Sequence, residues 1–459
     1  MYREEFGKLF KLALPLSLAQ VAQNTTALVD TLMVGRLGDD ALAGIAIGAT
    51  MFQFTHLVLA GVIHSVSPIV SQATGAREID KIGRAVRQGF LIAVVGAIPC
   101  FLVYWNAAPI LRWMGQDEHV VEMSSSYLRA ISFGILPALL TFPLRGLLEG
   151  ISETRPILVI CLVGVGLNVF LNDVLMFGKF GFPALGLVGT GVASSVVYSL
   201  VFLMLAGFVW KRHSQHDVFS RFLSPDLPMI NELLRVGVPI AMTIFFEFSM
   251  FAICAFAMGA VGAKQLAAHQ IAMQTASMTF MIALGIGLAT SVRVGIFAGK
   301  RDMMRAKVAG QIGMLVSSGA MFLMAVLFWT VPETIISFYL DTAVPENQTV
   351  LKYAVSFLAV AAWFQVADGL QVAASNSLRG LKETKAAMKW TLLAYWLIGI
   401  PAGAALGFKL ERLGGWGLNW GGVGLWYGLT TGLAAAALFL AVRFHWEFRS
   451  RLHGKEPVL

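Results

Sequence analysis

The sequence predicts an all-α polytopic membrane protein, with twelve transmembrane helices in two six-helix lobes related by a pseudo-twofold axis along the membrane normal. Three observations predict this fold: few charged residues, apolar runs that recur along the whole chain, and an internal repeat. Of the 459 residues, 57% are hydrophobic and only 13% are charged. A soluble protein of this size carries about 25% charged residues.

Apolar runs long enough to cross a bilayer follow one another from the N-terminus to the C-terminus. One crossing as a helix takes about 20 residues. The sequence predicts helices over 8–34, 41–72, 85–108, 123–148, 155–177, 185–210, 230–260, 265–297, 308–331, 349–378, 386–408 and 420–444. The second, eighth and tenth of these runs are long, so we expect tilted or kinked helices there.

Lys and Arg residues alternate between two sets of connecting segments. Of the 34 Lys and Arg residues, 26 lie in the N-terminal tail, in 77–87, 145–155, 211–235, 293–307 and 379–389, and in the tail from 443. Segments rich in Lys and Arg face the cytoplasm. We therefore expect both termini in the cytoplasm, with Arg293 and Arg379 as anchors at cytoplasmic helix ends. The net charge of +8 is then a topology signal and gives little support to a nucleic-acid partner.

The second half of the chain repeats the first in order. The spacing between matching segments is constant for the first three pairs and grows slowly for the last two. The matching pairs are KLALP (11–15) with RVGVP (235–239), GRLGDDALAGIAI (35–47) with GAVGAKQLAAHQI (259–271), TGARE (74–78) with AGKRD (298–302), GISET (150–154) with GLKET (380–384), and GLVG (186–189) with GGVG (421–424). These pairs indicate two homologous halves.

The repeat predicts the domain organisation. We expect an N-lobe of helices 1–6 over 1–211, a cytoplasmic linker over 212–229, and a C-lobe of helices 7–12 over 230–459. Because six is an even number, both halves have the same orientation in the membrane, as in transporters built from parallel repeats. Transport by alternating access uses such a duplication directly.

Four acidic residues lie inside the predicted spans, where an ionisable group is costly and usually faces a cavity or a partner. Glu247, in TIFFEFSMF, is in the middle of helix 7, and Asp368, in WFQVADGLQ, is inside helix 10. These two carboxylates could share a cation or a proton. Asp30 and Asp173 lie nearer to helix ends, which could supply water or a cap, so a purely structural role stays open for both.

Other polar residues of the spans carry weaker signals. Asn168 and Asn172 lie beside Asp173 in helix 5, and His269 and Gln270 lie at the start of helix 8. A lone His is more often a packing or hydrogen-bonding residue. Arg145 and Glu149, one helical turn apart, are expected to form a local surface pair.

Motifs of soluble enzymes are absent from the sequence. It contains no GxxxxGK[ST], GxSxG or HExxH motif, and its three cysteines, Cys100, Cys161 and Cys254, are far apart. We therefore expect neither an enzyme nor a cofactor. Energy coupling would come from an ion gradient, with Na⁺ or H⁺ as the coupling ion.

Several motifs together resemble the MATE family of multidrug and toxic compound extrusion transporters, in particular its NorM branch. They are LALPLSLAQVAQ with VDTLMVG, SPIVSQATGA, NVFLNDVLMFGKFGFPALGLVGTGVA, GVPIAMTIFFE, LAAHQIA, SVRVG and QVAASNSLRGLKET. The resemblance covers nearly the whole chain. It implies a multi-pass protein of the bacterial cytoplasmic (inner) membrane that exports cationic and amphipathic drugs and dyes. Because a chain with two lobes could act alone, we expect a functional monomer.

The resemblance also implies roles for individual residues. Glu247 and Asp368 would form the cation site of the C-lobe and would hold the metal if Na⁺ is the coupling ion, while Asp30 would be the acid of the N-lobe. The candidates for the substrate cavity are Asn168, Asn172, Asp173, His269, Gln270, Phe364 and Gln365. Some Na⁺-coupled relatives have a Tyr one turn before the helix 10 Asp, where this chain has Phe364, and Phe offers no oxygen to a cation.

Two other functions remain as alternatives. The first is a flippase for lipid-linked precursors, which shares the architecture but needs a larger and more basic cavity. The second is a polytopic enzyme acting on lipid, which needs catalytic His and Asp clusters in the cytoplasmic loops. The acidic residues deep in the spans and the short basic loops favour the drug and ion exchanger over both.

Overall fold

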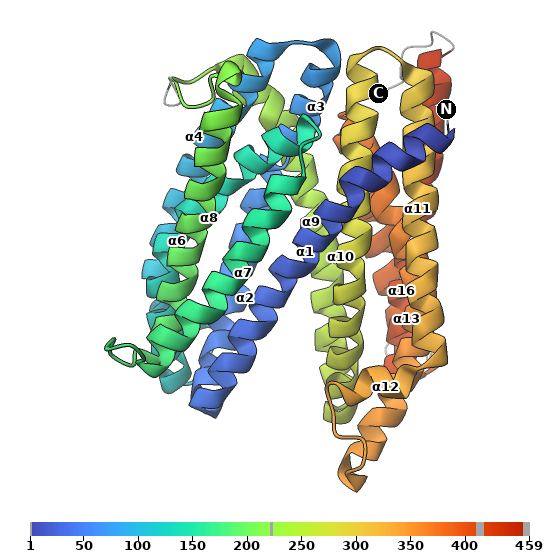
Figure 1. Ribbon diagram of the computed structural model, residues 1–459. Helices are drawn as coiled ribbons and strands as arrows, with labels where there is room; N and C mark the ends of the chain where they lie inside the picture. Colours follow the sequence, from blue (N-terminus) through green and yellow to red (C-terminus); the bar gives the residue numbers. More distant parts are fainter. Residues whose placement is uncertain (1, 221–223, 410–416, 453–459) are drawn as a thin grey trace. The chain divides into compact units, whose positions relative to one another are not determined.

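The computed structural model describes residues 2–220, 224–409 and 417–452, and these are almost entirely helical (Figure 1). The α-helices are α1 (Tyr2–Val34), α2 (Asp39–Ile63), α3 (Val66–Ala76), α4 (Ile79–Trp105), α5 (Ala107–Trp113), α6 (Glu118–Gly150), α7 (Arg155–Phe177), α8 (Gly186–Arg212), α9 (Leu227–Val261), α10 (Ala263–Gly299), α11 (Met303–Thr330), α12 (Pro332–Ser337), α13 (Gln348–Gly380), α14 (Thr384–Leu392), α15 (Ile400–Gly407) and α16 (Gly422–Leu452). Shorter elements are the 3-10 turns η1 (Gly35–Leu37), η2 (Ser214–His216) and η3 (Pro345–Asn347), and the π-helical segment η4 (Leu393–Gly399).

Each of the twelve predicted spans corresponds to a helix or to helices in succession. Within the described residues, eleven segments are long and apolar enough to cross a membrane, and α1 is the twelfth long helix. The polar residues of α1, among them Gln20, Gln23, Asn24 and Asp30, lower its hydropathy. The second span consists of α2 and α3, which separate at a turn at His64 and Ser65, so the kink expected there is confirmed.

The backbone repeats as the sequence does. Residues other than Gly adopt a positive φ angle rarely. Arg77 (φ 63°) and Arg301 (φ 60°) do so at matching positions of TGARE and AGKRD, and Ser152 (φ 66°) and Lys382 (φ 62°) do so at matching positions of GISET and GLKET. The hydrogen bonds that close these helix ends repeat as well: Glu78 N to Ala73 O matches Asp302 N to Phe297 O, and Glu153 N to Leu148 O matches Glu383 N to Leu378 O. The internal repeat is therefore a repeat of structure.

The chain divides into two compact units inside two of its helices. Residues 18–241 form one unit, called here the N-unit, and the described residues before and after this range form the C-unit. The two division points, after Ser17 and after Ala241, are equivalent positions of the repeat. Each follows a proline inside a helix, Pro15 of α1 and Pro239 of α9. The lobes at 1–211 and 230–459 with a linker at 212–229 stay a prediction.

A glycine allows a close helix crossing at each division point. In the C-unit, a Cβ atom added to Gly285 of α10 would lie 2.3 Å from the backbone nitrogen of Ser17. In the N-unit, a Cβ atom added to Gly61 of α2 would lie 2.8 Å from the Cα atom of Ala241. Gly61 and Gly285 are themselves equivalent positions of the repeat. Small residues permit the close backbone approach on which helix packing in membranes depends.

The segment between α8 and α9 is bound to α4 by polar contacts within the N-unit. Arg84 Nε donates to Asp226 Oδ2 at 2.5 Å, and Gln88 Nε2 donates to the carbonyl oxygen of Ser224 at 3.0 Å. The Arg84 guanidinium lowers the pKa of Asp226 below its usual value. These contacts attach the described part of the predicted linker to the first turns of α4.

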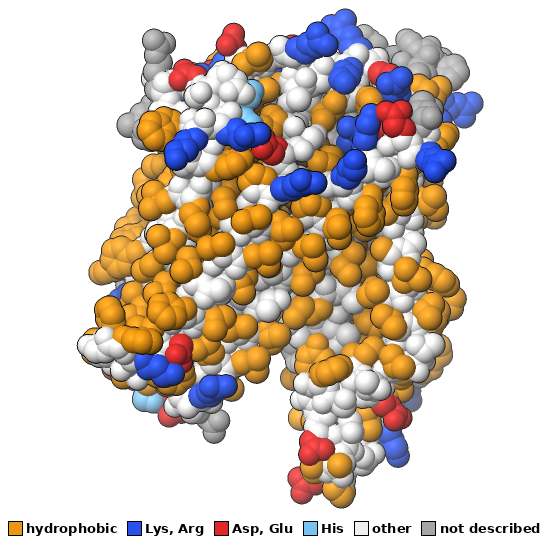
Figure 2. Space-filling model, viewed as in Figure 1, with side chains coloured by type: hydrophobic (Ala, Val, Ile, Leu, Met, Phe, Trp, Pro, Cys, Tyr) orange, Lys and Arg blue, Asp and Glu red, His pale blue; other side chains and the backbone are white. Residues whose placement is uncertain are grey.

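The surface has the pattern of a membrane protein. On the face shown in Figure 2, hydrophobic side chains cover much of each unit, and many Lys and Arg side chains of each unit lie toward one of its ends. Exposed large apolar residues such as Val95, Leu162, Leu203, Leu315 and Leu438 lie on helices from both units. Apolar side chains exposed along many helices of a protein are expected where lipid surrounds it.

Candidate functional site

In the N-unit, Asp30 is held by polar side chains of neighbouring helices. Asn172 Nδ2 of α7 donates to Asp30 Oδ1 at 2.5 Å and also lies 3.2 Å from Asn168 Oδ1. Asn168 and Ser194 of α8 also interact with the Asp30 carboxyl group. Asn168 and Asn172 are 1% and 0% exposed. Buried polar groups of this kind remain in a membrane span only when they are hydrogen-bonded or serve a ligand.

Asp173 does not join this cluster, although it follows Asn172 directly. Consecutive residues of an α-helix point about 100° apart around the axis. Asp173 instead pairs with Lys179, whose Nζ atom lies 2.8 Å from each carboxylate oxygen, and the two side chains are 39% and 53% exposed. This geometry is that of a local ion pair at the C-terminal end of α7.

In the C-unit, α9, α13, α16 and η4 meet around the middle of α9. Trp396 Nε1 of η4 donates to Ser249 Oγ of α9 at 3.1 Å, and the rings of Phe251 and Phe364 lie 6.0 Å apart. Met250 packs closely against Gly399 of η4 and Gly432 of α16. These contacts fix the helix turn that carries Glu247 against α13 and η4.

The carboxyl groups of Glu247 and Asp368 interact across this meeting point, and the hydroxyl group of Tyr395 interacts with both. Asp368 is 3% exposed and Tyr395 is fully buried. The Tyr395 hydroxyl oxygen has no hydrogen-bond partner among the described residues. The structure thus brings together the two predicted acids and adds an oxygen that the sequence did not indicate.

Glycines position Tyr395. A Cβ atom added to Gly428 of α16 would lie 2.2 Å from the Cα atom of Gly403 of α15, and one added to Gly432 would lie 2.9 Å from the Cα atom of Gly399. The span of α14, η4 and α15 therefore packs backbone to backbone against α16. Its π-helical segment adds a residue to the turn, a distortion that is frequent at functional sites.

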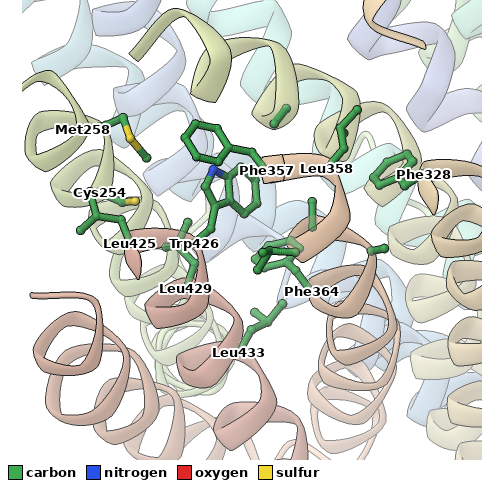
Figure 3. Packing of buried hydrophobic residues seen from close by; sticks show 14 of the residues in the cluster. Cys254, Met258, Phe328, Phe357, Leu358, Phe364, Leu425, Trp426, Leu429 and Leu433 are labelled. Atoms are coloured by element: carbon green, nitrogen blue, oxygen red, sulfur yellow. The ribbon is translucent and has the colours of Figure 1, made fainter. Parts of the chain in front are cut away.

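Phe364 lies one turn before Asp368 in a buried apolar cluster (Figure 3). Its ring centroid is 6.0 Å from that of Trp426, which is also 5.6 Å from the His269 ring. His269 is 2% exposed, whereas Gln270 is exposed and lies outside the cluster. Gln365 is fully buried and donates to Thr279 Oγ1, and its Oε1 atom has no partner among the described residues. Phe364 and His269 thus both pack against the ring of Trp426.

The expectation of a surface pair at Arg145 and Glu149 is wrong. These side chains are 4% and 2% exposed, with Arg145 Nε 4.0 Å from Glu149 Oε1. Arg145 Nη2 also donates to Gln20 Oε1 of α1 at 2.8 Å. The sequence did not indicate that these residues are buried. The face of α6 that carries them packs inward against α1 and α3, so the pair lies in the interior of the N-unit.

The arrangement can hold a small cation. Two carboxyl groups and a phenolic oxygen supply oxygen ligands, which hard cations prefer, and a carboxyl group can instead take up a proton. No group of three or more His, Cys, Asp and Glu side chains forms a metal cluster within the described part of the chain. A metal ion there would therefore need oxygen atoms from other residue types, such as Tyr395.

Sequence comparison identifies the family. Residues 15–174 and 239–404 match the MatE family, and the two matches begin at the repeat-related prolines Pro15 and Pro239. The chain is 36% identical over 456 residues to the "Probable multidrug resistance protein NorM" of Mesorhizobium japonicum, which covers 98% of this chain and 96% of that protein. It is 35% identical over 453 residues to the "Multidrug resistance protein NorM" of Vibrio vulnificus, covering 98% and 97%.

Solved structures show the same fold. The eukaryotic MATE transporter AtDTX14 superposes with a TM-score of 0.86 at 22% identity, covering 99% of each chain. A structure described as MATE in the straight conformation superposes with a TM-score of 0.88 at 17% identity, covering 98% of this chain and 97% of that one. The chain thus belongs to the MatE family, the multidrug and toxic compound extrusion family, and is a transporter rather than an enzyme.

Proposed function

We propose that the protein is a secondary active multidrug efflux transporter, an antiporter that exports cationic and amphipathic drugs and dyes in exchange for Na⁺ or H⁺. The observation that carries this proposal is the pair Glu247 and Asp368, which come from two different helices and interact electrostatically with each other and with the buried Tyr395. Relatives that share about a third of the sequence over nearly the whole chain carry the name multidrug resistance protein.

The pair of acids supplies the coupling. Two carboxylates in a site with little water repel each other, so binding a cation or a proton there is favourable. An ion drives transport only when it binds the two conformations of the protein with different affinity. Alternation between an inward-open and an outward-open state, each with its own affinity at Glu247 and Asp368, then exchanges the ion for the drug.

The cluster around Asp30 is a second cation-binding group in this proposal. Its carboxyl group is oriented by Asn172 and interacts with Asn168 and Ser194, so the N-unit presents an oriented acid that can carry a negative charge. An organic cation, a proton or Na⁺ gains from that charge. Asp173, which pairs with Lys179, has no part in transport here.

The protein's place in the cell follows from its charge pattern. The distribution of Lys and Arg supports a cytoplasmic location of both termini, and the relatives named above are bacterial, so we assign the chain to the bacterial cytoplasmic membrane. We further propose that a single chain is the functional unit, because each chain holds both repeats and both acidic groups.

Dye efflux from vesicles with the purified protein tests this function. An inward Na⁺ gradient and an inward H⁺ gradient are imposed separately, and the export of ethidium is followed by fluorescence. We expect export under one of the two gradients and none without a gradient. If neither gradient drives export, the antiporter is wrong and transport of lipid-linked precursors becomes the next function to test.

A further inference from the structure

Arg379 differs from the other interior arginines of the described chain. Arg145 has the Glu149 carboxylate at 4.0 Å, and Arg293 donates to both oxygens of Glu5 at 2.6 Å. Among the described residues, no carboxylate lies within ion-pair distance of Arg379, whose contact is Asn376 Oδ1 at 3.5 Å. An arginine stays charged in a protein, so this guanidinium is a permanent positive charge without an ion-pair partner.

The position of Arg379 directs this charge toward the coupling site. Asp368 and Arg379 are separated by about three helical turns, so both lie on one face of α13. The same face carries Gln371, Ser375 and Asn376, each at most 2% exposed. Side chains of an α-helix tilt toward its N-terminus, so the long Arg379 side chain extends back toward Asp368.

Glu247 is the acid that receives this charge. Its carboxyl group interacts electrostatically with Arg379, and the guanidinium interacts in turn with Glu247. Glu247 is also the acid whose negative charge repels that of Asp368. The group therefore contains two carboxyl groups and one guanidinium, which interacts electrostatically with Glu247 but forms no ion pair with either acid.

We propose that Arg379 is a tethered cation that competes with the coupling ion for Glu247, an inference that rests on the proposed function. When Na⁺ or a proton leaves, Arg379 neutralises Glu247 and so favours release. When the ion arrives, it takes over that role. The guanidinium thereby lowers the affinity of the site for the ion to a value that allows turnover.

The test compares variants that remove, keep or divert the charge. Ethidium efflux is measured from vesicles as a function of the concentration of whichever cation drives the wild type. Arg379→Gln should lower the half-saturating cation concentration by about tenfold or more, because it removes the positive charge that repels the coupling cation. Its maximal rate should fall, because the ion leaves slowly. Arg379→Lys should stay close to the wild type.

A second variant tests the same idea with the arginine in place. Asn376→Asp puts a carboxylate beside the guanidinium, so it should also lower the half-saturating cation concentration. Arg305→Gln is the matched control. Arg305 is exposed on α11 and pairs with Asp302, the N-cap of that helix, so this variant should leave the half-saturating cation concentration unchanged. If both Arg379→Gln and Asn376→Asp keep the wild-type value, or if Arg379→Lys shifts it as much as Arg379→Gln, the tethered cation is wrong.

The outcomes separate this inference from the proposed function. A wild type without efflux under either gradient, or full efflux by Glu247→Gln, overturns the antiporter itself. An inactive Glu247→Gln variant together with unchanged cation dependence in Arg379→Gln and Asn376→Asp overturns only the role of Arg379.

Discussion

Asn172 of α7 donates a hydrogen bond to Asp30 of α1 at 2.5 Å, so the acid of the N-unit is oriented by a neighbouring helix. Hydrogen bonds to charged groups contribute about 1.5–3 kcal/mol. Asn172→Ala removes this bond, and we expect slower ethidium efflux together with a lower midpoint of thermal unfolding. The adjacent change Asp173→Asn breaks only the exposed pair with Lys179 and should leave efflux near the wild-type rate. Equal efflux by both variants would remove Asp30 and Asn172 from the transport path.

Tyr395 is predicted to contribute its hydroxyl oxygen to the bound cation. Tyr395→Phe keeps the buried ring and removes that oxygen, so the half-saturating concentration of the driving cation should rise several-fold in the efflux assay. Tyr427→Phe, at a residue 41% exposed, is the control and should leave the value unchanged. If the Tyr395 hydroxyl does not bind the cation and is only buried without a partner, Tyr395→Phe should instead make the protein more stable and leave its cation dependence unchanged.

The crossing of α1 and α10 depends on Gly285. A Cβ atom there would lie 2.3 Å from Ser17 N, and a backbone atom cannot move aside as a flexible side chain can. Gly285→Ala should therefore lower the thermal unfolding midpoint in detergent, measured by tryptophan fluorescence. Gly166→Ala is the control, since nothing lies within 4 Å of its added Cβ atom. That variant should gain up to about 1 kcal/mol from the better helix propensity of Ala; an equal response of both variants would contradict the close crossing.

The contact between Arg84 and Asp226 should make the attachment of the linker depend on pH. Because Arg84 lowers the pKa of Asp226, the contact stabilises the folded linker above the usual pKa of Asp, about 4, and this stabilisation is lost as the pH falls through the lowered value. Asp226→Asn should increase hydrogen exchange in residues 213–220 at pH 7. The difference from the wild type should disappear in acid; a difference that persists there would contradict the charge as its cause.

The sequence predicted the helices and the repeat because both are one-dimensional patterns. Apolar runs set the spans, and the spacing that relates KLALP to RVGVP reappears in the backbone angles of Arg77 and Arg301. Glu247 and Asp368 were recognisable because a charge inside an apolar run is costly. Their proximity to each other is shown only by the structure.

The remaining parts of the site depend on which way side chains point. Tyr395 is an ordinary residue of an apolar span, and the π-helical turn that directs it toward Glu247 leaves no clear sequence signal. Arg379 has the sequence context of a cytoplasmic anchor, but its side chain extends back along α13. Asn172 and Asp173 are neighbours in sequence and face different surroundings, one Asp30 and the other Lys179.

We propose that ion binding at Glu247 and Asp368 drives export. The most direct measurement is the initial rate of ethidium efflux from vesicles under the driving gradient, for the wild type, Glu247→Gln, Asp368→Asn and the exposed control Glu346→Gln. Size-exclusion profiles verify that each variant is folded. We expect Glu247→Gln and Asp368→Asn to retain less than about a tenth of the wild-type rate, as for a group essential to the cycle, and Glu346→Gln to keep it. Full efflux by either Glu247→Gln or Asp368→Asn would contradict the proposal that ion binding at these two acids drives export.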